Sequence, residues 1–328
     1  MKMRYKIIIK PLAFTIGLLI LLVIMSDFLN HNGYYVGPYS KMSGILHAQK
    51  NSVDYLLIGD SECNASISPI EIWDQYGYTG YNCGIPGQKL QDTYYWFKKV
   101  LKHQSPKVVL LETNVFYRKF TYVNKLENSV DYGMKYNFPV FQFHNDWAHF
   151  NIKSLKIHPL KQESATPTKV IEGFKFNPKI SPYKKGPYIH KTDKVVDISD
   201  PALTYLNKIV ELCNERHIQL ILYSAPTPLC WTYAKHNTAS LFAKENNLPY
   251  IDLNLHLRDL KINWSKDTRD KGNHLNYYGA KKVTTYVGKY LSLHTNLADH
   301  RGDKSYSHWN DAYQNYLVII QRKETPKN

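Results

Sequence analysis

The chain has 328 residues, of which 43% are hydrophobic, and it carries a formal net charge of +15 at pH 7. This length suits one large α/β domain or two small ones, and the apolar content excludes a chain that is disordered throughout. The positive charge favours an anionic partner, and composition leaves open nucleic acid, acidic lipid headgroups and anionic envelope polymers. The 27 tyrosines suit either sugar-stacking surfaces or ordinary packing.

The N-terminus predicts a membrane anchor. Lys2, Arg4, Lys6 and Lys10 precede an apolar run from residue 12 to 29 whose only charge is Asp27. A run of about 18 residues is just long enough to cross a bilayer as a helix, and the basic flank should stay in the cytoplasm. A cleaved signal peptide is the main alternative, but no A-x-A-like site follows the run. We therefore expect a single-pass protein of the cell membrane with its domain outside the cytoplasm, which argues against a nucleic-acid partner.

The remaining chain divides by composition and periodicity into four parts. After the anchor at 1–30, a polar, glycine-containing tether spans 31–50, a folded domain spans 51–295 and a tail spans 296–328. Within the domain, residues 118–200 form an irregular insertion rich in Pro, Tyr, His and Lys, either a functional lid or binding surface or a partly disordered excursion.

Strand and helix patterns alternate through the domain. Buried strands are predicted at 53–59, 79–87, 107–114, 218–226 and 248–254. Helices are predicted at 69–76, 91–104, 201–217, 231–247 and 279–293, and Trp309, Tyr313, Tyr316, Leu317 and Ile320 give the tail one helical packing face. Such alternation predicts an α/β fold of three layers, with a parallel sheet between helices on both faces.

Ser61 is the candidate nucleophile. It lies in Gly59-Asp60-Ser61, where the first strand ends, and ligands of open α/β sheets gather at the carboxyl ends of strands. A serine needs a base, and His274 lies four residues after Asp270 in a loop that precedes a helix. The alternatives are a plain turn at Ser61 and a helix-capping loop at His274.

Two further residues suit an oxyanion site. Gly87 follows the second strand and Asn114 the third, so a backbone amide and a side-chain amide can reach the same sheet edge as Ser61.

These residues together resemble the GDSL/SGNH serine hydrolase superfamily. Gly59-Asp60-Ser61 matches its first block, Gly87 in NCGIPGQ the second, Asn114 in ETN the third, and Asp270 with His274 the last. The resemblance covers about residues 51–295 and implies a flavodoxin-like α/β/α sandwich and esterase or acyltransferase chemistry that requires no metal or cofactor. The chain departs from the family in two places, since three residues separate Asp270 from His274 and the third block lacks G-x-N-D. Asp267 is therefore an alternative orienting acid.

The resemblance assigns a role to each residue. Ser61 would attack an ester carbonyl, Asp270 would orient His274 as the base, and the Ser61 and Gly87 amides with the Asn114 side chain would hold the oxyanion. The acyl group would then pass to water or to a sugar hydroxyl.

The anchored, outward-facing architecture is similar to that of proteins acting in teichoic acid D-alanylation and exopolysaccharide O-acetylation. It implies an anionic or sugar polymer of the cell envelope as partner, and possible exchange with a membrane-bound acyl-donor protein. The alternative is a non-catalytic, membrane-tethered polysaccharide-binding or assembly protein on the same fold.

The four cysteines, at positions 63, 83, 213 and 230, contain no C-x-x-C pair, so the sequence does not support a zinc ribbon or a thioredoxin-like motif. Cys63 and Cys83 follow strands that we expect to be neighbours. A disulfide between them stays open, because sequence does not determine pairing.

Overall fold

The computed structural model describes residues 2–31, 41–120 and 170–324, with residues 130, 133, 134, 138 and 141 between them. The chain forms two compact units: residues 1–40 with 121–166, and residues 41–120 with 167–328. The second unit contains the sheet and every candidate site residue. Most of the predicted insertion, from residue 121 to 169, lies outside the described residues.

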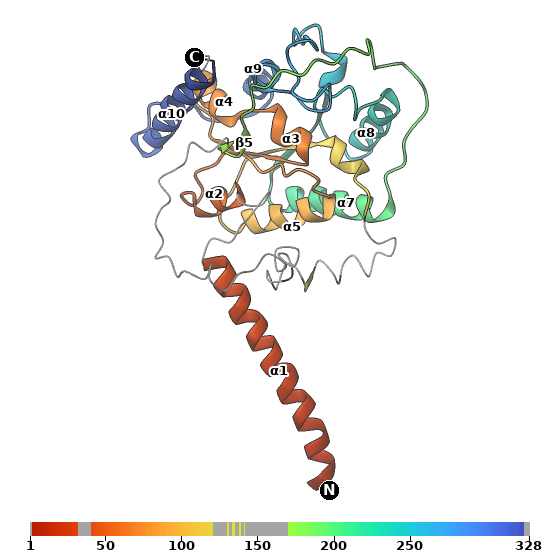
Figure 1. Cartoon of the computed structure of the whole chain (residues 1–328), viewed down its shortest axis with the longest axis vertical. Helices are drawn as coiled ribbons and strands as arrows, with labels where there is room; N and C mark the ends of the chain where they lie inside the picture. The colour runs from red at the N-terminus through yellow and green to blue at the C-terminus, as the bar shows by residue number, and fades with distance from the viewer. Residues whose placement is uncertain are drawn as a thin grey trace. The chain divides into compact units, whose positions relative to one another are not determined.

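Helix α1 (Lys2–His31) is the longest described element of the first unit (Figure 1). Its segment Ile9–Ser26 has a mean hydropathy of 2.2 over 18 residues, with 6% of the segment buried. The predicted apolar N-terminal helix is therefore present, and it is long and apolar enough to cross a membrane.

The second unit is built on a parallel five-stranded sheet. The strands are β1 (Tyr55–Ile58), β2 (Gly80–Asn82), β3 (Val108–Glu112), β6 (Gln219–Ser224) and β7 (Tyr250–Asp252). They pair in the order β2-β1-β3-β6-β7, which in chain order is the 2-1-3-4-5 arrangement of flavodoxin-like folds. Nearly every strand residue is buried, as expected for a parallel sheet covered on both faces. The predicted strands all form, shorter by a few residues than expected.

Helices cover both faces of this sheet. On one face lie α3 (Ser61–Ser66), α4 (Pro69–Tyr76) and α9 (Tyr277–His294), and their apolar side chains pack on Tyr55, Leu57, Leu110 and Ile221. On the other face α5 (Leu90–Val100) packs against α7 (Asp200–Glu215), while α8 (Tyr233–Glu245) contacts β7 (Figure 1). The predicted three-layer α/β sandwich is therefore confirmed.

Three short 3-10 helices and one hairpin complete the described structure. The 3-10 helices are η2 (Thr113–Tyr117), η6 (Leu253–Leu255) and η7 (Lys304–Tyr306). In the region predicted as an insertion, β4 (Val170–Ile171) and β5 (Phe174–Lys175) pair antiparallel. Phe174 and Phe176 are buried, so this end of the insertion belongs to the core of the domain.

Both ends of the domain bury apolar side chains. Part of the predicted tether, residues 42–47, forms helix α2 (Met42–His47), in which Met42 and Ile45 are buried; residues 32–40 lie outside the described residues. The tether therefore does not extend through residue 50, because its apolar residues find core contacts that composition alone did not reveal. At the other end, α10 (Ser307–Glu324) buries Trp309 and Tyr316 against α4 and β5.

Candidate active site

Ser61 lies at a tight turn between β1 and α3. Gly59 has φ +147°, and an added Cβ there would lie 2.9 Å from the Cβ of Glu112, so only glycine fits the turn. Asp60 then caps the helix by accepting a hydrogen bond from the Glu62 amide at 3.1 Å, and Ser61 is the first helical residue. The turn thus holds Ser61 beside the β1/β3 boundary, the point where strand order reverses and ligands bind in such sheets.

His274 is fixed by Asp270. Asp270 Oδ2 lies 2.6 Å from His274 Nδ1, and Asp270 Oδ1 accepts the His274 backbone amide at 2.7 Å. The loop that carries both residues needs glycine at position 272, where φ is +95° and a Cβ would lie 2.8 Å from the Tyr183 ring. Burial lowers the pKa of His274 below its usual 6.5, against the opposing effect of Asp270. The imidazole is therefore neutral at pH 7, and the Asp270 carboxylate favours the tautomer that leaves Nε2 free.

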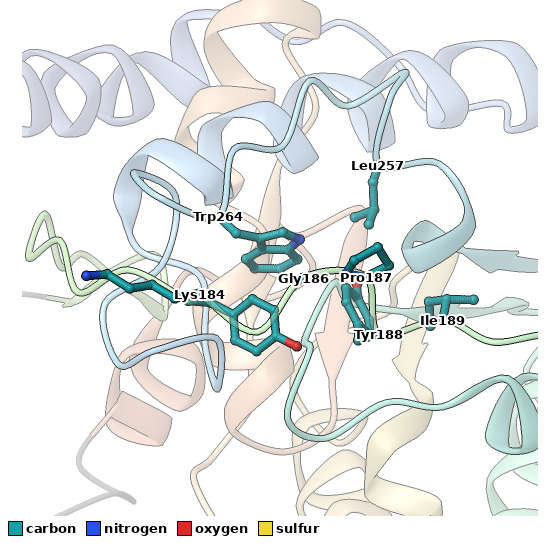
Figure 2. Close-up of a pocket in the computed structure, with 8 residues that line it drawn as sticks. Lys184, Gly186, Pro187, Tyr188, Ile189, Leu257 and Trp264 are labelled. Carbon is teal, nitrogen blue, oxygen red and sulfur yellow. The ribbon is translucent and has the colours of Figure 1, made fainter.

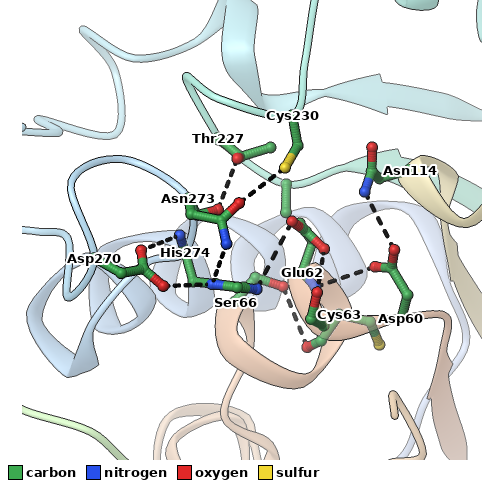
Figure 3. A network of polar contacts seen from close by, with 12 residues as sticks. Asp60, Glu62, Cys63, Ser66, Asn114, Thr227, Cys230, Asp270, Asn273 and His274 are labelled. Atoms are coloured by element: carbon green, nitrogen blue, oxygen red, sulfur yellow. Dashed lines mark hydrogen bonds and ion pairs between the residues drawn. The ribbon is translucent and has the colours of Figure 1, made fainter. Parts of the chain in front are cut away.

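Glu62 lies between Ser61 and His274, and Figure 3 shows its approach to His274. Ser61 Oγ donates a 2.7 Å hydrogen bond to Glu62 Oε2, while Glu62 Oε1 lies 3.9 Å from His274 Nε2. Both Glu62 Oε1 and His274 Nε2 are buried and lack a hydrogen-bond partner among the described residues. The predicted direct contact between His274 and Ser61 is therefore not the arrangement seen here; the carboxyl group of Glu62 connects the two.

Arg118 balances the negative charge under the nucleophile. Its Nε lies 2.5 Å from Asp60 Oδ2, and its Nη2 lies 3.1 Å from Ser61 Oγ and 3.3 Å from Glu62 Oε2. Asp60 and Glu112 are fully buried and Glu62 is 3% exposed, so three acids share this region. Burial, reinforced by the charge of Asp60, raises the pKa of Glu62 to about 8.

Of the two predicted oxyanion residues, Asn114 lies beside the Ser61 turn and Gly87 lies in an exposed loop. Asn114 Nδ2 donates to Asp60 Oδ2 at 3.2 Å, and its Oδ1 accepts from Lys235 Nζ at 3.2 Å, so Asn114 lies beside the nucleophile turn. Gly87 is exposed with φ +73°, in the loop after β2. The described contacts bring together Ser61, His274, Asp270 and Asn114, and they record no contact between Gly87 and these residues.

Two other expectations concern neighbouring residues. Asp267 does not orient His274; its Oδ2 lies 2.6 Å from Lys282 Nζ and accepts from the Asn263 amide. Cys63 and Cys83 are both free and buried, so the disulfide that the sequence left open is not formed.

Glu62, Arg118 and Lys235 were not predicted. Glu62 had one available signal, an acid in the segment directly after an apolar strand, where burial is expected. Arg118 and Lys235 had none, because only the fold brings them to Ser61.

An aromatic cavity lies on the same domain, and Figure 2 shows its lining residues. It has a volume of about 440 Å³ and is lined by Tyr183, Tyr188, Trp264, Leu257, Pro187, Ile189, Gly186 and Lys184. The Tyr188 hydroxyl donates to Asn254 Oδ1 at 2.8 Å, and Lys271, between Asp270 and His274, donates its amide to Ser181. Tyr183 of the lining packs close to Gly272, so the cavity lies beside the loop that carries His274.

Comparison with known proteins finds solved structures of low sequence identity. No protein-family model and no curated protein matches the chain. A GDSL-like lipase from Bacteroides thetaiotaomicron matches at 12% identity and a TM-score of 0.38, over 78% of this chain and 97% of that one. An acetyl xylan esterase matches at 17% identity and 0.37, over 72% and 98%. A lipase/acylhydrolase from Enterococcus faecalis matches at 13% and 0.34, over 75% and 98%. At these identities the chain is similar to a GDSL-like lipase, an acetyl xylan esterase and a lipase/acylhydrolase.

Proposed function

We propose that the protein is a serine esterase or O-acyltransferase that works through an acyl-serine intermediate. The observation that carries the proposal is the row of polar groups from Asp270 through His274 and Glu62 to the Ser61 hydroxyl, at the carboxyl end of the sheet, with 3.9 Å between His274 and Glu62. A serine hydroxyl is activated for attack on a carbonyl when a neutral imidazole, oriented by an acid, can take its proton.

The reaction follows from these contacts. Ser61 Oγ attacks the ester carbonyl, and its proton passes toward His274, whose positive charge Asp270 stabilises. Arg118 Nη2 donates to the same Oγ at 3.1 Å and so favours the developing alkoxide. The protonated His274 then returns the proton to the leaving alcohol, and the acyl group passes from Ser61 to water or to another hydroxyl.

Oxyanion stabilisation is assigned to groups beside the turn. The backbone amide of Ser61 begins a helix, and the Asn114 amide group lies next to Asp60. Rotation of the Asn114 side chain away from Asp60 would direct Nδ2 to the carbonyl oxygen, and Gly87 would add a backbone donor when its exposed loop approaches the substrate.

The substrate we propose is an acyl ester, in particular an acetyl ester, on a sugar or teichoic-type polymer of the cell envelope. A helix able to cross a membrane, a net charge of +15 and an aromatic cavity beside the His274 loop support this substrate. With helix α1 as an anchor, the domain would lie outside the cytoplasm, where a membrane-bound protein could also supply the acyl group.

The test is labelling and turnover at Ser61. The detergent-solubilised full chain should react with a fluorophosphonate probe and hydrolyse p-nitrophenyl acetate, and Ser61→Ala should abolish both while its circular dichroism spectrum and melting temperature stay unchanged. Equal labelling of the wild type and Ser61→Ala would refute the site. No labelling of either would favour a non-catalytic polysaccharide-binding protein.

A further inference from the structure

We propose that Glu62 is a catalytic residue that relays the proton of Ser61 to His274 as a neutral carboxylic acid. This inference rests on the proposed serine chemistry and adds a residue to it. It begins from the contacts on both sides of one carboxyl group: Oε2 accepts the Ser61 hydroxyl at 2.7 Å, and Oε1 lies 3.9 Å from His274 Nε2. The carboxyl group of Glu62 therefore keeps His274 from contacting Ser61 directly, but it can pass a proton from one to the other.

The two unpartnered atoms indicate what the carboxyl group does. Glu62 Oε1 and His274 Nε2 are both buried without a hydrogen-bond partner among the described residues, and such atoms are costly unless they meet a partner. The two atoms lie 3.9 Å apart. A movement of about 1 Å brings them to hydrogen-bond distance, with Oε1–H donating to Nε2. An ion pair between a Glu62 carboxylate and a His274 imidazolium would also satisfy both atoms, but burial disfavours both charged forms, so the neutral pair is the state we propose.

The surroundings favour this protonation state. The titratable and charged groups that face Glu62 are Asp60, Glu112, Arg118, Cys230, Lys235, Arg269 and His274. Arg118 is the cation in hydrogen-bond contact, and its shorter contact is with Asp60, at 2.5 Å against 3.3 Å to Glu62. The charge of Arg118 is thus taken up mainly by Asp60, while burial favours neutral Glu62 and neutral His274.

The proposed step balances without any further group. As Ser61 Oγ forms its bond to the acyl carbon, its proton moves to Glu62 Oε2. The proton on Glu62 Oε1 moves at the same time to His274 Nε2, and the carbonyl electron pair moves to the oxygen. Glu62 ends neutral, protonated on its other oxygen, and His274 becomes an imidazolium bound to Asp270. The reverse transfer protonates the leaving alkoxide.

The variant Glu62→Gln tests proton transfer through residue 62 while keeping the hydrogen bonds of its side chain. In Glu62→Gln the amide oxygen can still accept from Ser61 and the NH₂ group can still donate to His274, but no proton can pass through. We expect kcat/KM for p-nitrophenyl acetate to fall about 10²–10⁴-fold, the range of a lost proton-transfer group. The matched control is Glu71→Gln, because Glu71 is also a buried acid with a raised pKa. It lies away from the site and accepts a 3.0 Å hydrogen bond from the Tyr316 hydroxyl. It should keep wild-type turnover.

The pH profile of the unaltered protein gives a second measurement. The relay needs His274 neutral and Glu62 protonated, so kcat/KM should rise through the His274 pKa, below 6.5, and fall again above about pH 8. A serine–histidine pair alone predicts a plateau above neutrality. The alkaline fall should be absent from the residual activity of Glu62→Gln.

The outcomes are distinct from those of the proposed function. If Ser61→Ala abolishes turnover while Glu62→Gln stays within tenfold of wild type, or if Glu62→Ala is faster than wild type, Glu62 is a blocking group and the relay is refuted. A wild-type profile that stays level from pH 7.5 to 9.5 refutes it equally, even where a variant fails to fold. Loss in Glu62→Gln with an alkaline limb near pH 8 supports it.

Discussion

Replacing Asp270 with asparagine tests how His274 is made into a base. To accept a proton at Nε2, the neutral imidazole must carry its own proton on Nδ1. Asp270 enforces this tautomer, because its Oδ2, 2.6 Å from Nδ1, can only accept. The Asn273 side chain lies 3.1 Å from the same nitrogen and can donate to it. In Asp270→Asn, both neighbours can donate to Nδ1, and the imidazole should hold its proton on Nε2, where it cannot act as a base.

The size of the effect follows from these contacts. Two neutral hydrogen bonds of about 1 kcal/mol each oppose the reactive tautomer, and the imidazolium loses a charge-assisted bond of about 1.5–3 kcal/mol. The sum of about 3.5–5 kcal/mol corresponds to a loss of about 10³-fold in kcat/KM. Adding Asn273→Ala removes one of the two donors, so the double variant should recover about fivefold.

The assay is steady-state hydrolysis of p-nitrophenyl acetate, with the melting temperature measured in parallel. Asp270 is 36% exposed, so the fold should tolerate asparagine there. Asp259→Asn is the matched control, since Asp259 makes a similar contact with His256 Nδ1, at 3.1 Å on the surface, and should keep full activity. Turnover of Asp270→Asn within tenfold of wild type, with an unchanged melting temperature, would show that Asp270 does not set the tautomer.

The remaining predictions concern substrate binding and stability. Trp264→Ala should raise KM for an acetylated polysaccharide without changing turnover of p-nitrophenyl acetate; an equal effect on both substrates would argue against a sugar-binding cavity. Arg118→Met should lower the free energy of unfolding by about 2 kcal/mol, measured in urea, because it leaves Asp60 buried without its cation; a value near zero would contradict this pairing. Trp309→Ala should cost about 3–5 kcal/mol, since the ring is 3% exposed and lies 5.5 Å from that of Trp73, and an unchanged urea midpoint would exclude α10 from the core. Glu62→Gln should stabilise the fold. The pKa of Glu62 is raised to about 8 in the folded protein, so above about pH 4.5 the unfolded chain loses this proton first and the free energy of unfolding of the wild type falls as pH rises. Urea curves at pH 4 and pH 8 should therefore show the gain mainly at pH 8.

Local sequence patterns were sufficient to predict most of the fold. The apolar runs at 55–58, 108–112 and 219–224 are strands because a parallel sheet covered on both faces buries nearly every residue, and the intervening helices repeat their apolar positions at helical spacing. The turn at Gly59-Asp60-Ser61 and the adjacent Asp270 and His274 could also be recognised, because each motif lies within a few consecutive residues.

The tertiary structure alone determined how these motifs meet. Nothing local indicates that Arg118 lies across Asp60 and Ser61, or that Lys235 reaches Asn114, since these contacts join residues 57 to 121 positions apart. The same holds for Glu62. Its place in the sequence predicts burial beside Ser61, but its position between Ser61 and His274 depends on α3 packing against α9 and on the direction of the loop before α9. Chain neighbours are constrained by backbone geometry, whereas the distance between a serine and a histidine 213 residues away is determined by the packing of the whole sheet and its helices.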